Sequence, residues 1–213
     1  MICPEQFPAE VQSLFAYFAS HDVSLYLVGG AVRDWLRGVR PKDYDFTVGL
    51  DPQQLQSILA ASDFSLDLKG LKFGTIGVIL NGQSYEISSH RREAGYEDLR
   101  HPNSVAFDVT LEEDLARRDF TINAMAWSPE TGLIDPYGGQ VDLERGLIRA
   151  VGDPQKRITE DALRGLRALR FAASLDFQLE AKTREAVLNS KQGLLTLPAE
   201  RVEAQLGLSR NDR

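Results

Sequence analysis

The stretch Leu27-Val28-Gly29-Gly30-Ala31-Val32-Arg33-Asp34, followed by Lys42-Asp43-Tyr44-Asp45-Phe46, decides the fold that this chain can adopt. The apolar run 25–28 predicts a short buried strand, which stops at the glycines. Residues 31–37 have helical character, and Gly38 and Pro41 end that segment. Because glycines let backbone N–H groups approach a polyanion, this strand–turn–helix unit predicts a phosphate-binding turn.

The next predicted strand carries carboxylates on one face. Asp43, Asp45 and Thr47 alternate with apolar residues, so their side chains point to the same side. Like charges this close are costly unless a cation lies between them, and Mg²⁺ ions that join carboxylate and phosphate oxygens promote phosphoryl transfer. The alternative is an exposed face with solvated acids. We therefore predict nucleotidyl transfer, with Asp43 and Asp45 as catalytic Mg²⁺ ligands and a triphosphate held by Gly29, Gly30 and Arg33.

Composition excludes several classes of protein. The 213 residues are 43% apolar, enough for one large domain, or one domain and part of another. The single cysteine, Cys3, allows neither an internal disulfide nor a zinc site of cysteines. Without a signal peptide or an apolar run of about 18 residues, we expect a cytoplasmic protein with no membrane contact. The net charge of −7 means that RNA contact would require a local basic patch.

The pattern of elements changes near Gly152. Before it, helices alternate with strands, and Asn81-Gly82 predicts a tight hairpin turn. After Pro154 only helical patterns occur, and Thr159 is a candidate N-cap. We predict an α+β fold with a head domain at 1–152 and an all-helical neck at 153–213. The predicted helices are 8–21, 52–61, 111–126, 159–175, 181–190 and 199–208, and the strands are 25–28, 43–48, 64–68, 74–80, 84–88, 132–136 and 147–151.

Glu86 is a candidate third acid, because the hairpin strand that carries it could pair beside the acid strand. The alternative is a solvent-facing glutamate. Residues 89–103 then lose all periodicity and predict a long polar loop, which in a compact domain is usually functional or disordered. The candidate residues of this flexible loop are Arg91, Arg92, Tyr96 and Arg100.

Two further motifs combine acids with arginines. In the run from Arg117 to Asn123, a planar guanidinium group suits phosphate and ribose oxygens, and Asp119 could accept a ribose hydroxyl; the alternative is a charged helix end. Asp161 and Arg164 could together present the hydrogen-bonding edge of a base and so select a nucleotide. The alternative is an acid that suits the helix dipole, in an ion pair worth a few tenths of a kcal/mol.

Four motifs in this order resemble the class II tRNA nucleotidyltransferases, which add CCA or part of it to tRNA 3′ ends and belong to the polymerase-β-like nucleotidyltransferase superfamily. The resemblance covers about 26–177 and rests on LVGGAVRDWLRG with DYD, EEDLARRDFTINAMA, DPYGGQVDLERGLIRAVGDP and RITEDALRGLRALRFAA. It implies a polymerase-β-like head with a mixed sheet and a helical neck, joined by a hinge. It implies Mg²⁺ at Asp43 and Asp45, a sugar motif at Arg118 and Asp119, and a template for CTP and ATP at Asp161 and Arg164. The nucleotide-binding residues would be Gly29, Gly30, Arg33, Arg118, Asp119, Asn123, Asp161 and Arg164.

Three alternatives are open. Bacterial poly(A) polymerase is a near relative, but its Arg-Arg-Phe stretch reads Leu71-Lys72-Phe73 in this chain. The complete loop favours a CCA- or A-adding enzyme over a CC-adding one. Family members usually continue into body and tail domains that hold the tRNA, whereas this chain stops at Arg213. We therefore expect either a truncated form, which could bind without catalysing, or a protein partner that grips the tRNA.

Overall fold

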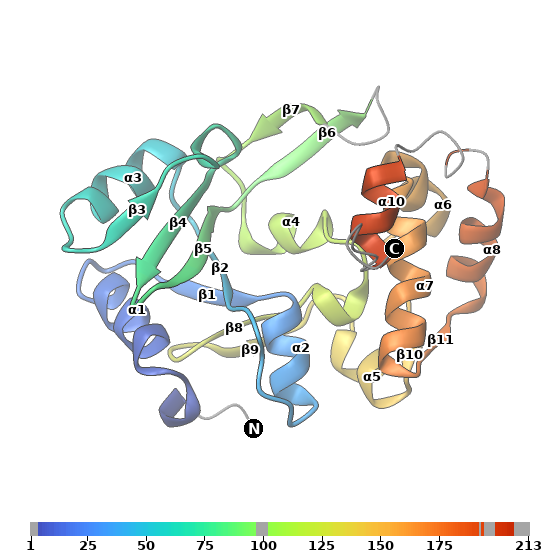
Figure 1. Ribbon diagram of the computed structural model, residues 1–213, viewed down its shortest axis with the longest axis horizontal. Helices are drawn as coiled ribbons and strands as arrows, with labels where there is room; N and C mark the ends of the chain where they lie inside the picture. The colour runs from blue at the N-terminus through green and yellow to red at the C-terminus, as the bar shows by residue number, and fades with distance from the viewer. Residues whose placement is uncertain (1–3, 97–101, 192, 194–198, 207–213) are drawn as a thin grey trace.

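The computed structural model describes residues 4–96, 102–191, 193 and 199–206 of the chain. Its centre is a seven-stranded mixed sheet with the strand order β3-β4-β5-β2-β1-β8-β9 (Figure 1). β2 and β5 run parallel, and the other neighbours run antiparallel. The predicted α+β class with a mixed sheet is therefore confirmed. The strands are β1 (Leu25–Val28), β2 (Asp45–Val48), β3 (Ser65–Asp67), β4 (Thr75–Leu80), β5 (Gln83–Ser89), β8 (Ala126–Ser128) and β9 (Gly132–Ile134).

The helices gather in two places. α1 and α3 contribute side chains to the main core under the sheet, while α6, α7, α8 and α10 lie together at the other end of the molecule (Figure 1). Within the described residues, no helix combines the length and apolar character that a bilayer span requires. The helices are η1 (Pro4–Gln6), α1 (Ala9–Ala19), α2 (Gly30–Leu36), α3 (Pro52–Ala60), η2 (Leu71–Phe73), α4 (Leu111–Ala116), η3 (Thr121–Asn123), α5 (Gly139–Glu144), α6 (Pro154–Glu160), α7 (Leu163–Leu175), α8 (Ala181–Asn189) and α10 (Ala199–Leu206).

Local sequence explains the elements around the main core. The α3 helix starts at a capping box, in which the Asp51 carboxylate accepts from the backbone of Gln54 and the Gln54 side chain accepts from the backbone of Asp51. Asn81 and Gly82 both have positive φ, at 50° and 79°, as a two-residue hairpin turn requires. The apolar stripe predicted for α1 is fully buried, and it consists of Val11, Leu14, Phe15 and Phe18.

A second apolar core joins residues on both sides of position 152. Phe120 and Ile148 pack in one cluster with Ile158 of α6 and Phe171 of α7. Strand β10 (Leu147–Ile148) also pairs in parallel with β11 (Gln178–Leu179). Within the described part of the chain, β11 is a departure from the predicted all-helical neck, because it is a strand and pairs with β10 of the linking stretch, residues 135–154. The division into domains at 152 stays a prediction.

The predicted polar loop at 89–103 is partly wrong. Strands β6 (Arg92–Tyr96) and β7 (Pro102–Ala106) form an antiparallel ribbon, with Arg92 opposite Ala106 and Glu93 opposite Val105. Arg92 and Ala106 are exposed, while Glu93 and Val105 are partly buried. Among the described residues these two strands pair with each other as a separate two-stranded sheet, and the sequence that forms them shows no apolar alternation. Arg100, one of the predicted loop residues, lies outside the described residues.

Two predicted helices are also wrong in their extent. The helix predicted at 111–126 ends at Ala116, because the chain then pairs with the linking stretch through a β-bridge between Phe120 and Ala150. The helix predicted at 159–175 is two helices. Asp153, not Thr159, is the N-cap of α6, since its carboxylate accepts from the backbone N–H of Lys156 at 2.9 Å.

Candidate active site

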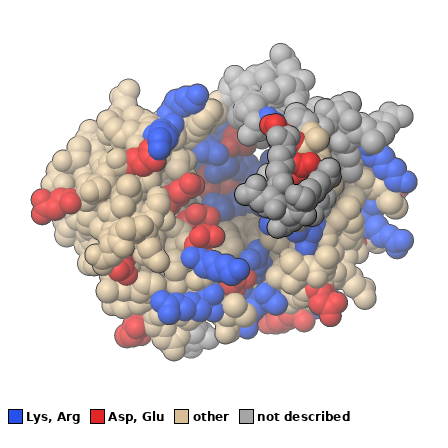
Figure 2. Space-filling model, in the orientation of Figure 1, with Lys and Arg blue, Asp and Glu red and all other residues tan. Residues whose placement is uncertain are grey.

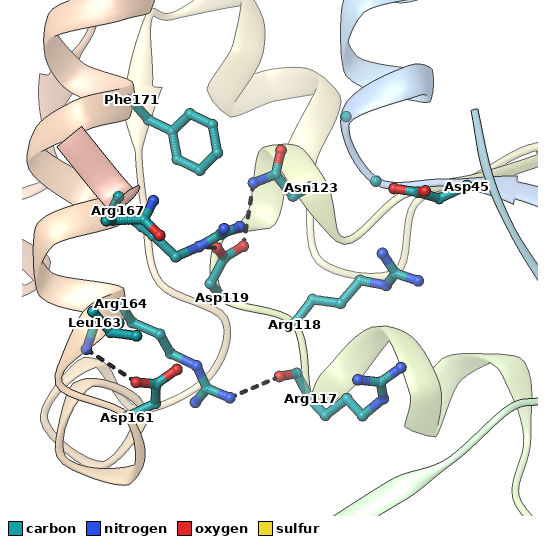
Figure 3. A pocket seen from close by; sticks show the side chains of 13 residues that line it. Asp45, Arg117, Arg118, Asp119, Asn123, Asp161, Leu163, Arg164, Arg167 and Phe171 are labelled. Carbon is teal, nitrogen blue, oxygen red and sulfur yellow. Dashed lines mark hydrogen bonds and ion pairs between the residues drawn. The ribbon is translucent and has the colours of Figure 1, made fainter. Parts of the chain in front are cut away.

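A cleft of about 450 Å³ lies between the sheet and α7. Acidic and basic side chains meet around the hollow in the centre of the face seen in Figure 2. The cleft brings together residues that the sequence singled out in four separate motifs, and Figure 3 shows how several of them point into it. Its predicted lining residues are Gly29, Gly30, Asp45, Arg118, Asp119, Asn123, Asp161 and Arg164, and the others are Arg117, Leu163, Arg167, Phe171 and Gln205.

The acid strand lies beside the strand that carries Glu86. Asp45 is the first residue of β2 and stands next to Glu86 in the parallel register with β5. Both side chains are exposed and alternate with buried neighbours, so they share one face of the sheet. Desolvation by the surrounding protein atoms, which acts on the carboxyl group although part of the residue is accessible to solvent, and the charges of Glu86 and Asp43 raise the pKa of Asp45, while the charge of Arg118 lowers it. The predicted pairing of the two strands is confirmed.

Asp43 occupies a different position from the predicted one. It lies before β2 rather than within it, and it lines a second cavity of about 370 Å³ that shares Gly30 and Asp45 with the cleft. Among the described residues, no group of three or more histidine, cysteine, aspartate or glutamate side chains is arranged to hold a metal ion. Any ion at Asp43 and Asp45 would therefore need further ligands from a bound substrate.

The glycine turn is shaped by a close approach. Gly29 has a φ of +69°, and a Cβ atom at this position would lie 3.1 Å from Nη1 of Arg118. A larger residue would therefore be strained and would press on the arginine. Glycine at position 29 thus lets the end of β1 and the side chain of Arg118 meet at the edge of the cleft.

Arg33 is buried and forms a link inside the protein. Its Nε and Nη2 each lie 2.9 Å from Oδ1 of Asp34, and its Nη1 donates to Oδ1 of Asn123 at 2.9 Å. The guanidinium group also lies 5.2 Å from the centre of the Phe171 ring. Asp34 is therefore a structural partner of Arg33. Arg33 itself lines the second cavity.

Asp119 is a buried hydrogen-bonding centre. Its Oδ2 accepts from Nε of Arg167 at 2.6 Å, and its Oδ1 accepts from the backbone N–H of Phe120 at 2.8 Å and from Asn123 at 3.2 Å. Burial opposes ionisation, but the charge of Arg167 and these hydrogen bonds lower the pKa of Asp119 overall. A carboxylate has about four acceptor sites, so Asp119 keeps capacity for one more donor.

Asp161 and Arg164 lie at the junction of α6 and α7. Asp161 is extended, with φ −147° and ψ 106°, and its carboxylate accepts from the backbone N–H of Leu163 at 3.0 Å. Nη1 of Arg164 donates to Glu160 at 2.8 Å and to the carbonyl oxygen of Arg157 at 2.9 Å. The break between the helices thus places one acceptor and one forked donor side by side in the cleft.

The predicted loop residues have partners within the protein. Arg91 donates to Glu93 at 2.8 Å and to the carbonyl oxygen of Phe73 at 2.6 Å. Arg92 donates to Glu113 at 2.6 Å, in an ion pair that is largely exposed. Tyr96 belongs to β6.

Sequence reasoning missed several residues of the cleft. Arg167 and Phe171 follow Arg164 at spacings of three and seven, so a helical stripe on α7 was the signal that could have found them. Gln205 comes from α10, which packs on α7 late in the chain. Nothing in the local sequence of α10 indicates that contact.

A mixed sheet with adjacent carboxylates on one face, joined by one cleft to the junction of α6 and α7, is the arrangement of a nucleotidyltransferase head. The sequence model of the poly A polymerase head domain matches residues 25–149. The chain belongs to this family, on the branch of the class II tRNA nucleotidyltransferases, as the motifs predicted.

Known proteins of similar sequence and structure are CCA-adding enzymes. That of Lactobacillus helveticus is 43% identical over 180 residues, which cover 84% of this chain and 44% of the relative. That of Bacillus pumilus is 43% identical over 186 residues, or 87% and 46%. The Bacillus stearothermophilus enzyme in complex with CTP has a TM-score of 0.82 at 35% identity, covering 97% of this chain and 48% of that one. The chain thus spans about half the length of its relatives.

Proposed function

We propose that this chain transfers nucleotidyl groups from CTP or ATP to the 3′ end of tRNA, as a CCA- or A-adding enzyme. The observation that carries the proposal is that Asp45 shares one cleft with Asp161 and Arg164. A carboxylate suited to phosphoryl transfer therefore lies in the same space as a pair suited to reading a base. Relatives solved with CTP, and a Thermotoga maritima CCA-adding enzyme solved with tRNA (TM-score 0.72, 27% identity), support both substrates.

The order of residues along the cleft supports one orientation of the nucleotide. Asp161 and Arg164 lie at one end, Asp119 in the middle, and Arg118 with Asp45 at the other end (Figure 3). The base would pair with the first two, because one accepts and the other donates hydrogen bonds. A ribose hydroxyl would use the remaining acceptor capacity of Asp119. The phosphates would then reach Arg118, the glycine turn and the second cavity that Arg33 lines.

The acid pair fits a divalent metal ion, which we propose to be Mg²⁺. Asp43 and Asp45 supply the oxygen ligands that Mg²⁺ prefers, and this ion usually completes its shell with substrate phosphates and water. Desolvation and the charges of Glu86 and Asp43 raise the pKa of Asp45, and a cation at this point would oppose these effects by stabilising the ionised carboxylate. When bound, the ion would supply charge neutralisation on the phosphates.

The protein's own contribution is to position and select. The 3′-hydroxyl oxygen of the tRNA forms a bond to the α-phosphorus, the bond to the bridging oxygen breaks, and pyrophosphate and a proton are released. Arg118 would stabilise the charge that moves onto the leaving pyrophosphate. Since Asp161 and Arg164 belong to the protein, the choice of base requires no nucleic-acid template.

The test is a nucleotide-addition assay with purified protein. The tRNA substrates lack the whole CCA end, lack only the terminal A, or are complete, and each nucleoside triphosphate is supplied separately. We expect CCA or a terminal A to be added and a complete tRNA to be left unchanged. A long tail made from ATP alone would instead indicate a poly(A) polymerase, and tRNA binding without turnover at high Mg²⁺ would indicate a binding module. Asp43→Ala is the control, which should abolish addition while the circular dichroism spectrum is retained.

A further inference from the structure

We infer that Asp114 is a positioning residue, which holds Arg118 in the direction that nucleotide phosphates require and ties the β6–β7 ribbon to the same point. This inference rests on the proposed function, because it takes Arg118 as a ligand of the phosphates. Asp114 does not line the cleft. It lies in the first turn of α4, and its side chain is fully buried.

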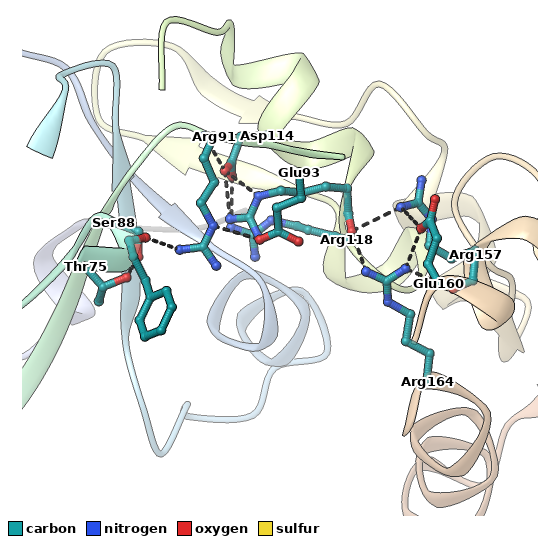
Figure 4. Close-up of polar contacts among 11 residues, drawn as sticks. Thr75, Ser88, Arg91, Glu93, Asp114, Arg118, Arg157, Glu160 and Arg164 are labelled. Atoms are coloured by element: carbon teal, nitrogen blue, oxygen red, sulfur yellow. Dashed lines mark hydrogen bonds and ion pairs between the residues drawn. The ribbon is translucent and has the colours of Figure 1, made fainter. Parts of the chain in front are cut away.

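One carboxylate receives donors from three residues (Figure 4). Oδ1 of Asp114 accepts from the backbone N–H of Arg91 at 3.1 Å and from Nε and Nη2 of Arg117 at 3.0 and 2.8 Å. Oδ2 accepts from Nη2 of Arg118 at 3.3 Å. Oδ1 of Asp114 thus binds Arg117 and the backbone that leads into the ribbon, while Oδ2 binds Arg118.

Arg118 depends on this contact for its orientation. Asp114 is the one hydrogen-bonding partner that the described residues give to the Arg118 side chain, and Nε of Arg118 is buried without a partner. The guanidinium group points toward Asp45 and the glycine turn (Figure 3). Without the Asp114 carboxylate, the attraction of Asp45 would act unopposed, and Arg118 would turn toward the acids that have to bind the metal ion.

The ribbon meets the same centre. Arg117 also donates to Glu93 of β6 at 3.1 Å, and Glu93 accepts from Arg91 at 2.8 Å. Arg91 directly precedes β6, its backbone N–H donates to Asp114, and its side chain donates to Glu93. The buried carboxylate of Asp114 therefore binds both the residue that precedes the ribbon and the arginine at the phosphate end of the cleft.

The experiment is a double-mutant cycle read by calorimetric binding of CTP in the presence of Mg²⁺ and by kcat and KM of nucleotide addition. Asp114→Asn keeps the size of the side chain and removes its charge, and we expect CTP affinity to fall about tenfold, as for the loss of a hydrogen bond between charged groups. The matched control is Glu112→Gln, which removes one charge from an exposed side chain on the same helix. This control should leave affinity within about twofold of the wild type.

The cycle separates positioning from a structural role. If Asp114 acts through Arg118, then Asp114→Asn should weaken CTP binding by less than about twofold in an Arg118→Ala background. A full additional loss in that background would overturn the inference, and so would equal or tighter CTP binding by Asp114→Asn alone. If Asp114→Asn does not fold, Asp114→Glu, which keeps the charge but displaces it by one methylene, is carried through the same cycle.

Failure of this inference can be told from failure of the proposed function. A wild-type protein that binds CTP but extends no RNA would overturn the proposed function, while the binding cycle would still decide the role of Asp114. A wild-type protein that extends tRNA, together with an Asp114→Asn variant of unchanged affinity and kcat, would overturn only the inference. A protein that binds no CTP would overturn both.

Discussion

Replacing Asp119 tests whether the buried centre of the cleft stabilises the protein as its contacts indicate. Asp119→Ala leaves the donors of Phe120 and Asn123 without a buried acceptor, at about 1–2 kcal/mol each. It also removes the ion pair with Arg167, which is worth about 1 kcal/mol because that side chain is 36% exposed and screened by solvent. We expect the free energy of unfolding to fall by about 4 kcal/mol, and Tm by roughly 10 °C.

A comparison with Asp119→Asn separates the loss of the charge from the loss of the hydrogen-bond acceptor. Asparagine keeps one oxygen that can accept from Phe120 and Asn123, so the loss should be about 1–2 kcal/mol in urea-induced unfolding. An alanine variant that loses less than about 1 kcal/mol, or an asparagine variant that loses as much as alanine, would refute the reasoning.

The same pair of proteins carries a pH dependence. Because the pKa of Asp119 is lowered in the folded state, its contribution is complete above the unfolded pKa of about 3.9 and is lost as pH falls through the folded value. The stability gap between wild type and Asp119→Asn should therefore be constant from about pH 7 to pH 5 and close below about pH 4. A difference in stability that persists below about pH 4 would show that the charge of Asp119 is not what stabilises the wild type over Asp119→Asn.

Three further predictions concern the rest of the site. Gly139→Ala would place a methyl group against a backbone carbonyl oxygen of η3, and the free energy of unfolding should fall by more than about 3 kcal/mol. Gly138→Ala is strained only by its φ of +71°, and in the same assay the free energy of unfolding should fall by about 1–2 kcal/mol. Asp45→Asn should raise Tm of the metal-free protein at pH 7, because the folded-state pKa of Asp45 is raised. The gain should decrease as pH falls through the folded-state pKa and be absent below the unfolded pKa of about 3.9, and a lower Tm at pH 7 would contradict the electrostatic argument. Asp161→Ala combined with Arg164→Ala should equalise the kcat/KM values for CTP and ATP, and unchanged selectivity would reduce the two residues to structural roles.

Elements that local patterns specify could be predicted from the sequence. The strand at 25–28, the glycine turn and the Asn81-Gly82 hairpin depend on neighbouring residues, and all three are present. The pairing of β2 with β5 also followed from Glu86 and its strand, although nothing in the sequence indicated that the two strands run parallel.

Elements set by distant pairing could not be predicted. The end of α4 depends on the bridge from Phe120 to Ala150, and helical periodicity continues past that point in the sequence. The ribbon of β6 and β7 is formed by strands that pair with each other, and their sequence shows no apolar alternation. The break at Asp161 likewise interrupts a stretch that reads as one continuous helix, and it is the feature that turns this side chain into the cleft.

The candidate site divides in the same way. The eight predicted residues of the cleft lie in motifs where acids, arginines or glycines are concentrated. Their arrangement could be predicted only in part, since Arg33 is engaged with Asp34 and Asn123, and Asp119 with Arg167. Asp34 is adjacent to Arg33 in the sequence, but Asn123 lies 90 residues from Arg33, and Arg167 lies 48 residues from Asp119, so local patterns do not indicate these two contacts.

That second core has a consequence for synthesis of the protein. A ribosome releases Phe120 and Ile148 well before Phe171 and Val187, which complete the same apolar cluster. While the chain between Ile148 and Phe171 is synthesised, the apolar side chains of Phe120 and Ile148 lack the residues that pack against them in the folded protein. Domains generally fold as units, starting from the N-terminus. The cleft, whose far wall is α7, can therefore form only after the translated chain has passed α8.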